Sequence, residues 1–243
     1  MTPRRIGILG GMGPEATVLL MQKVIAAVPA RDDADHIPLI VDQNPQVPSR
    51  IRHLIEGTGA DPGPVLATMA QRLVAAGAEA LAMPCNTAHH YAPVIRAAVS
   101  VPFLDMVALS VAQAAALAGP GGKVGILGSP AVRKVGLFDA HLAAAGLTAV
   151  YPEDEDAMLS VIRRIKAEGP SEATRALLRA ASSEVLRQGA AVQVIACTEF
   201  SLVADAVDTN ARSIDSMDVL VGSIVHFALA TRTEDKTVAL QPR

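Results

Sequence analysis

The chain has 243 residues, of which 51% are hydrophobic, 19% charged and 2% aromatic, and its formal net charge is −3. This composition provides no basic surface or aromatic platform for nucleic acid, and the two cysteines are too few for a disulfide framework. The apolar runs fall short of the roughly 20 residues that a membrane helix needs, and glycines interrupt the first run too early for a signal peptide. We therefore expect a soluble cytoplasmic protein with no membrane or nucleic-acid partner.

Short apolar runs alternate with longer amphipathic runs along the chain. The short runs, bounded by turn residues, predict buried parallel strands at residues 5–9, 38–41, 80–83, 102–104, 124–127, 148–151 and 192–196. The longer runs predict helices at residues 15–28, 64–76, 107–117, 132–145, 155–167, 171–188 and 216–230. Strands that alternate with helices are typical of an α/β fold with a mostly parallel sheet.

The first strand and its turn recur in the second part of the chain. Residues 6–10 (Ile-Gly-Ile-Leu-Gly) return as residues 124–128 (Val-Gly-Ile-Leu-Gly), and each copy follows a basic residue and precedes a predicted helix. Cys85 and Cys197 also correspond, because each follows a predicted strand and is followed closely by a threonine. The repeat predicts two pseudo-symmetric parallel-sheet α/β domains with the active site in the cleft between them.

The predicted domains are discontinuous, because the last helix is expected to return to the first domain. The first domain comprises residues 1–103 and 212–243 and carries Cys85, and the second comprises residues 104–211 and carries Cys197.

A glycine-rich turn over residues 7–15 follows the first strand and opens the first helix. Such a turn lets a ligand approach the backbone, and a helix N-terminus attracts an anion. The spacing is not the G-x-G-x-x-G of dinucleotide-binding proteins, no convincing acidic residue ends the second strand, and no P-loop motif occurs. A site for a small carboxylate is the better functional interpretation, and a tight turn without a ligand is the structural alternative.

Cys85 and Cys197 are the strongest candidates for chemistry. Ligands of parallel α/β folds bind at the carboxyl ends of strands, where both cysteines fall, and a following helix start lowers the pKa of a thiol. Two thiols on opposite faces of one ligand can remove a proton from carbon and return one with inverted configuration, as racemisation requires. The alternatives are buried inert cysteines or a disulfide. The metal-ligand spacings Cys-x-x-Cys and His-x-x-x-His do not occur, so we expect no metal.

Three segments together resemble the aspartate/glutamate racemase family. They are residues 10–17 (Gly-Gly-Met-Gly-Pro-Glu-Ala-Thr), 83–89 (Met-Pro-Cys-Asn-Thr-Ala-His) and 196–199 (Ala-Cys-Thr-Glu). The first of them is similar to the aspartate racemase branch, and the resemblance spans residues 6–227. It implies a cofactor-independent racemase of aspartate, glutamate or both, without pyridoxal phosphate, that forms a homodimer. It also implies that Cys85 and Cys197 each act on one antipode.

The same resemblance implies which residues bind the substrate. Arg50, in the loop after the second strand, is similar to the arginine that pairs with the side-chain carboxylate, with Arg52 as a rival and Gln46 as a second polar contact. Lys166 is similar to a lysine that also meets the substrate. The remaining positions are Gly11 and Met12, which line the pocket, and Asn86, Thr87 and Thr198, which bind the α-carboxylate. For Arg50 and Lys166 the alternative is an exposed side chain without a ligand.

Two further candidates follow the cysteines in the sequence. His89 lies four residues after Cys85, where it either tunes the thiolate or serves packing. Glu199 either tunes Cys197, orients the backbone, or is a favourable carboxylate in the first turn of a helix. Asp42, at a strand end, is a further candidate for a polar residue in the pocket.

Other functions remain open at this point. Enzymes related to this family racemise hydantoins, isomerise maleate or decarboxylate arylmalonates. The cations Arg50 and Lys166 favour a dicarboxylate over a hydantoin or an aryl substrate, although maleate would also require cations. A two-lobed module that binds a metabolite without chemistry would explain the repeat and the glycine turns. It would not explain paired cysteines at strand ends.

Overall fold

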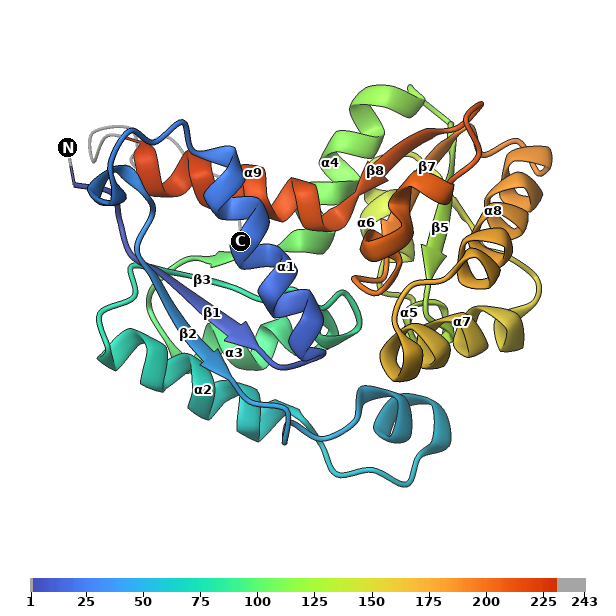
Figure 1. The fold of residues 1–243 in the computed structure, drawn as a ribbon. Helices are drawn as coiled ribbons and strands as arrows, with labels where there is room; N and C mark the ends of the chain where they lie inside the picture. The colour runs from blue at the N-terminus through green and yellow to red at the C-terminus, as the bar shows by residue number, and fades with distance from the viewer. Residues whose placement is uncertain (1, 231–243) are drawn as a thin grey trace.

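Two four-stranded parallel sheets organise residues 2–230, the part of the chain that the computed structural model describes (Figure 1). The strand order is β2-β1-β3-β4 in the first sheet and β6-β5-β7-β8 in the second. The two halves therefore share one topology, which confirms the predicted pseudo-symmetric α/β fold. Residues 231–243, part of the predicted first domain, lie outside the described residues. The strands are β1 (Ile6–Gly10), β2 (Leu39–Gln43), β3 (Ala80–Ala82), β4 (Phe103–Leu104), β5 (Lys123–Gly128), β6 (Thr148–Val150), β7 (Val192–Ala196) and β8 (Arg212–Asp215).

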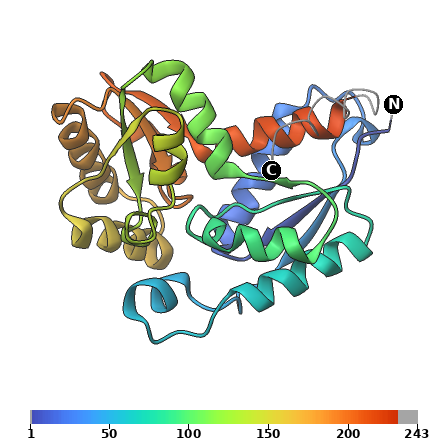
Figure 2. The ribbon, with the colours of Figure 1, turned by 180° about the vertical axis from the view of Figure 1, so that it is seen from behind.

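Helices cover both faces of each sheet, as the two opposite views show (Figures 1 and 2). Within residues 2–230, none of them combines the length and the apolar character needed to cross a membrane. The α-helices are α1 (Pro14–Ala27), α2 (Gly63–Ala75), α3 (Ala92–Ala98), α4 (Met106–Ala118), α5 (Pro130–Lys134), α6 (Asp139–Ala144), α7 (Glu155–Glu168), α8 (Glu172–Arg187) and α9 (Ser216–Leu229). Shorter segments are η1 (Asp33–Asp35), the π-helix η2 (Arg52–Glu56), η3 (Thr87–Tyr91) and η4 (Phe200–Ala206).

The core lies on both faces of both sheets, because successive side chains of a strand point to opposite faces. In β1, Ile8 packs in the cluster that includes α1 and α9, whereas Leu9 packs with α2 and α3. In β5, Ile126 faces α4 and α6, and Leu127 faces α7 and α8. Strands that are buried on both faces need continuous apolar runs, which is why β1 and β5 were recognisable in the sequence.

The sheet pairing differs from the two predicted domain boundaries, which fall within β4 and at the start of β8. Leu104 belongs to β4 of the first sheet, and Arg212 begins β8, which pairs with β7 in the second sheet. The second half therefore comprises residues 105–215. The first half comprises residues 2–104 together with α9, residues 216–230. The helix α9 packs against α1 of the first half.

Three elements differ from the sequence prediction for local reasons. The strand β8 was missed because it is a polar edge strand whose Ile214 is the fully buried residue. The predicted helix at 132–145 is two helices, α5 and α6, because Gly136 between them has a φ of 60°. The helix α3 was missed because it is only seven residues long.

Candidate active site

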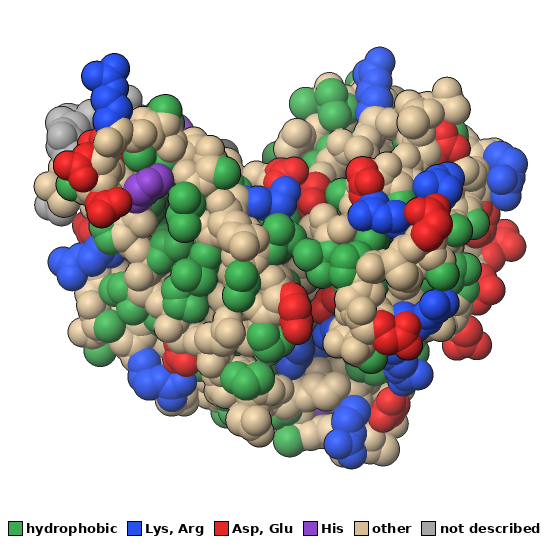
Figure 3. All heavy atoms as spheres, in the orientation of Figure 1, with side chains coloured by type: hydrophobic (Ala, Val, Ile, Leu, Met, Phe, Trp, Pro, Cys, Tyr) green, Lys and Arg blue, Asp and Glu red, His purple; other side chains and the backbone are tan. Residues whose placement is uncertain are grey.

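One cavity lies between the two halves, and both cysteines line it. Its volume, including the part that is open to solvent, is about 460 Å³. Charged side chains of both signs lie along the seam between the two lobes (Figure 3). The lining residues are Met12, Ser49, Arg50, Ile51, Cys85, Asn86, Thr87, Ser129, Ile162, Lys166, Ala196, Cys197, Thr198 and Glu199.

Cys85 reaches the cavity from the first half, in the turn that follows β3. Its N–H donates to the carbonyl oxygen of Met83 at 2.8 Å, which tightens this turn. The thiol is free, is 7% exposed and packs in an apolar cluster that includes Met12. Cys85 therefore follows a strand, as predicted, and lines this cavity.

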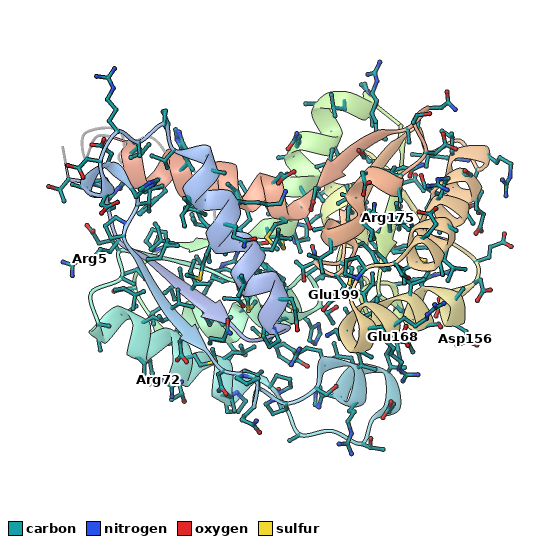
Figure 4. The ribbon with its side chains drawn as sticks, viewed as in Figure 1. Arg5, Arg72, Asp156, Glu168, Arg175 and Glu199 are labelled. Atoms are coloured by element: carbon teal, nitrogen blue, oxygen red, sulfur yellow. The ribbon has the colours of Figure 1, made fainter. Side chains whose placement is uncertain are left out.

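Cys197 reaches the same cavity from the second half, directly after β7. It is also free and 7% exposed, so the two cysteines form no disulfide. Its thiol donates to Glu199 Oε2 at 3.0 Å, and Glu199 Oε1 accepts an ion-paired hydrogen bond from Lys166 Nζ at 3.0 Å. Glu199 thus bridges Cys197 to the lysine of α7, and Figure 4 shows this glutamate between the two halves.

These contacts shift the pKa values of Cys197 and Lys166 upwards. Burial raises the pKa of the Cys197 thiol well above its usual value and the Glu199 carboxylate raises it further, while Lys166 acts in the opposite direction. Burial lowers the pKa of Lys166, but Glu199 and the two thiols outweigh burial, so the pKa is raised. The expectation that a helix start lowers the pKa of this thiol is therefore wrong for Cys197, because desolvation and a neighbouring carboxylate dominate.

The glycine-rich turn places Met12 in the cavity wall and Gly11 behind it. Gly11 has a φ of 91°, and its N–H donates to Thr17 Oγ1 at 2.9 Å. A Cβ atom at Gly11 would lie 2.4 Å from the backbone of Asn44, so only glycine fits there. The turn therefore shapes one wall of the site, as expected, through Met12 rather than through Gly11 itself.

The loop after β2 distinguishes between the two predicted arginines. Arg50 lines the cavity, and its Nη1 donates to the carbonyl oxygens of Val47 at 3.1 Å and Pro48 at 2.8 Å. Gln46 and Arg52 are exposed and stand outside the lining residues of the described cavity. The structure therefore brings Arg50 to the cysteines and leaves the other two candidates in solvent.

Asn86, Thr87 and Thr198 all line the cavity, and Thr87 forms a hydrogen bond to the second half. The hydroxyls of Thr87 and Ser129 share a hydrogen bond of 3.0 Å. Asn86 Nδ2 donates to Ser216 Oγ at 2.9 Å, whereas the buried Asn86 Oδ1 has no partner among residues 2–230. A buried acceptor without a partner is costly, so this oxygen suits an N–H group of a ligand.

His89 contacts the backbone of the Cys85 turn rather than the thiol. Its Nε2 accepts from the Met106 N–H at 3.1 Å, so its Nδ1 carries the proton and donates to the Cys85 carbonyl oxygen at 2.8 Å. The ring is 4% exposed, and burial lowers the pKa of His89 below its usual value although Asp105 opposes this. Of the two predicted roles, this geometry favours packing: a neutral histidine ties the Cys85 turn to the start of α4.

The remaining candidates lie elsewhere or were not recognised. Asp42 pairs with Arg72, which Figure 4 shows on α2 away from the cavity.

Ser49, Ile51 and Ile162 line the cavity and were not predicted, because nothing in their local sequence marks them. The repeat could have identified Ser129, which occupies the position that corresponds to Gly11 in the first copy. Within residues 2–230, no group of three or more His, Cys, Asp or Glu side chains could hold a metal ion.

The profile of the Asp/Glu/hydantoin racemase family matches residues 9–224, a range that includes every residue of the cavity lining. The chain belongs to this family. It is therefore a racemase, an isomerase, and the predicted resemblance is confirmed. A curated relative, the broad specificity amino-acid racemase RacX of Bacillus subtilis (strain 168), is 28% identical over 239 residues, which cover 93% of this chain and 98% of the relative.

Solved structures of racemases share the fold. The aspartate racemase of Picrophilus torridus has a TM-score of 0.82 and 24% identity, with 97% of this chain and 98% of that chain covered. An aspartate racemase homologue from Pyrococcus horikoshii OT3 has a TM-score of 0.72 and 23% identity, with 93% and 100% covered. The glutamate racemase isoform RacE1 of Bacillus anthracis has a TM-score of 0.65 and 16% identity, with 93% and 81% covered. The two-domain racemase architecture predicted from the sequence is thereby confirmed.

Proposed function

We propose that this racemase interconverts L- and D-aspartate, glutamate or both, and that Cys85 and Cys197 act on opposite faces of the α-carbon. The observation that carries the proposal is that both free thiols, one from each pseudo-symmetric half, line one small cavity. The similarity to curated RacX supports an amino-acid substrate. The cations Arg50 and Lys166 in the same lining support an acidic one.

In the proposed reaction, one thiolate removes the α-proton and the opposite thiol supplies a proton to the other face. The C–H bond breaks as an S–H bond forms on the first cysteine, and the second S–H bond breaks as a new C–H bond forms. After the reaction the first cysteine is a thiol and the second is a thiolate. The enzyme is then ready to act on the opposite antipode. Because Cys197 donates to a carboxylate, we assign Cys197 as a protonated thiol in the resting enzyme.

The carboxylate and amino groups of the substrate have matching partners in the cavity. Both hydrogen bonds of Arg50 use Nη1, so its Nε and Nη2 groups can take the side-chain carboxylate, with Lys166 beside them. We expect Thr87 and Thr198 to orient the α-carboxylate. The unpartnered Oδ1 of Asn86 would accept from the α-ammonium group. Charge on the carbanion is then stabilised by fixed dipoles and cations, so no bound cofactor is part of the proposal.

Solvent deuterium exchange at the α-carbon tests the substrate class. Reduced enzyme is incubated in D₂O with each antipode of aspartate, glutamate and several neutral amino acids, and NMR is read together with chiral chromatography. We expect exchange with loss of optical purity on an acidic amino acid. Racemisation of neutral amino acids alone would overturn the acidic assignment. Turnover of a hydantoin or of maleate instead would identify one of the alternative activities, and binding without exchange would support a metabolite-binding module.

Substitution of each cysteine tests the two-base assignment. Because a positioned acid or base contributes about 10²- to 10⁴-fold, we expect Cys85→Ala and Cys197→Ala each to reduce racemisation by at least about 10²-fold. Full activity in either variant would contradict the assignment. The predicted homodimer remains a separate proposal, which sedimentation velocity tests by asking whether the particle mass is twice 25.2 kDa.

A further inference from the structure

A buried chain of hydrogen bonds connects the turn that carries Cys85 to the end of β7, the strand that directly precedes Cys197. Asn86 Nδ2 donates to Ser216 Oγ at 2.9 Å, and the same hydroxyl donates to the carbonyl oxygen of Ile195 at 2.7 Å. Asn86 is the residue after Cys85, and Ile195 lies two residues before Cys197. Asn86 and Ser216 are 2% and 0% exposed, so water does not compete for these bonds.

The chemistry of the three groups fixes the direction of the chain. A carbonyl oxygen only accepts, so the Ser216 hydroxyl must donate its single proton to Ile195. The hydroxyl oxygen then accepts from Asn86, whose amide nitrogen must face Ser216. The amide oxygen of Asn86 is thereby turned away from Ser216, and this is the atom that lacks a partner in the described part of the chain.

Ser216 occupies the point where the chain passes from one half to the other. It is the first residue of α9, directly after β8 of the second sheet, while the body of α9 packs in the core of the first half. The preceding Asp215 caps the helix, since its Oδ1 accepts from the Met217 N–H at 2.9 Å. A shift of one half against the other would therefore strain the bonds at Ser216.

We propose that Ser216 is a positioning residue for racemisation, which holds the Cys85 turn at a fixed spacing from the Cys197 turn. The inference rests on the proposed two-cysteine reaction. After one thiol has taken the α-proton, inversion requires the opposite thiol to deliver its proton before the first returns its own. A small misplacement of the second thiol therefore slows inversion more than it slows the first proton removal. In D₂O this delay gives the S–H group of the first cysteine time to exchange with solvent, so that the first cysteine returns deuterium to the original face of the α-carbon.

Ser182 provides a matched control. It is also a serine with 0% exposure, its hydroxyl donates to Gln193 Oε1 at 2.6 Å, and it accepts from the Asp208 N–H at 3.0 Å. All of these residues lie in the second half. The substitution Ser182→Ala thus removes an equally buried hydroxyl with one donated and one accepted bond, but it leaves the connection between the halves intact.

The test compares exchange with inversion in D₂O for the wild type, Ser216→Ala and Ser182→Ala. The measured quantity is the deuterium content of recovered substrate divided by the amount of inverted product, which does not depend on how much enzyme is folded. We expect Ser216→Ala to raise this ratio at least about threefold and to slow racemisation about tenfold. Ser182→Ala should keep the wild-type ratio. An unchanged ratio in Ser216→Ala, or an equal rise in both variants, would overturn the inference.

Two additions keep the test decisive. Should Ser216→Ala fail to fold, Ser216→Cys keeps a similar shape with a weaker hydrogen-bonding group, and a smaller rise in the ratio is expected. Backbone hydrogen exchange gives a readout that needs no turnover: residues 83–88 and 194–199 should both exchange faster in the Ser216 variant, and a response in only one turn contradicts the inference. If the wild type racemises no acidic amino acid, the proposed function fails, while this exchange experiment still decides the role of Ser216.

Discussion

At the scale of single residues, the two cysteines have different surroundings although the halves are pseudo-symmetric. Cys197 donates to Glu199, which is ion-paired with Lys166, whereas His89 binds the backbone carbonyl of Cys85 and leaves its thiol alone. The proposed two-cysteine reaction requires one thiol to be protonated and the other to be deprotonated at the start of each turnover. The asymmetric placement of Glu199 offers a physical means to set that state.

Replacing Glu199 should lower the pKa of Cys197. Burial and Glu199 both raise this pKa, so Glu199→Gln removes a raising influence and leaves Lys166 as a lowering one. We expect the pH midpoint for alkylation of Cys197, measured with iodoacetamide in a Cys85→Ser background, to move to lower pH. A midpoint that stays fixed or rises would show that Glu199 does not control this thiol.

His89 should make stability depend on pH. Burial lowers its pKa from 6.5 in the folded state, so below pH 6.5 the unfolded chain binds more protons and stability is lost as pH falls towards the folded pKa. His89→Gln has no buried histidine to titrate, so only the wild type loses stability at low pH. The difference in unfolding free energy between wild type and variant should therefore be largest at pH 8 and smaller at pH 5.5, and it should change by at most about 1.4 kcal/mol per pH unit. Urea unfolding at both values measures it. A deficit that is equal at both pH values would contradict this account.

At the scale of elements, the turn between β1 and α1 depends on one glycine, whereas α9 tolerates a side chain. Gly11→Ala forces a Cβ to within 2.4 Å of the Asn44 backbone at a φ of 91° and should destabilise the protein by about 1–3 kcal/mol. Gly222 lies within α9 and has open space around it. We expect Gly222→Ala to raise the free energy of unfolding by about 1 kcal/mol. Urea unfolding distinguishes them, and equal effects would contradict this account of the turn.

At the scale of the whole molecule, α4 and α9 join the halves. The helix α4 packs on the second sheet and contacts α9, which packs on α1 of the first half. We therefore expect a single thermal unfolding transition, with equal calorimetric and van't Hoff enthalpies. Two separated transitions would indicate that the halves are stabilised independently. The contact between α4 and α9 also explains how residues that are distant in sequence can hold a cavity of fixed shape.

Periodicity and the repeat predicted most of the helices and strands and the position of both cysteines at strand ends. These features depend on local rules. A strand buried on both faces needs an apolar run, and a tight strand–helix turn needs glycine. These constraints act within a few residues and are therefore visible in order along the chain. The edge strand β8 has no apolar run, since it buries little more than Ile214, and periodicity therefore did not reveal it. Its omission shifted the predicted domain boundary.

The sequence by itself determined the α/β class, the twofold organisation and the placement of Cys85 and Cys197 at strand ends. Only the tertiary structure decided that Arg50 and not Arg52 faces the cysteines, that Glu199 binds Cys197, and that Ser216 joins the two turns. The physical reason is distance along the chain. Asn86 and Ser216 are 130 residues apart, and no local pattern encodes a bond that forms only when α9 packs back onto the first half.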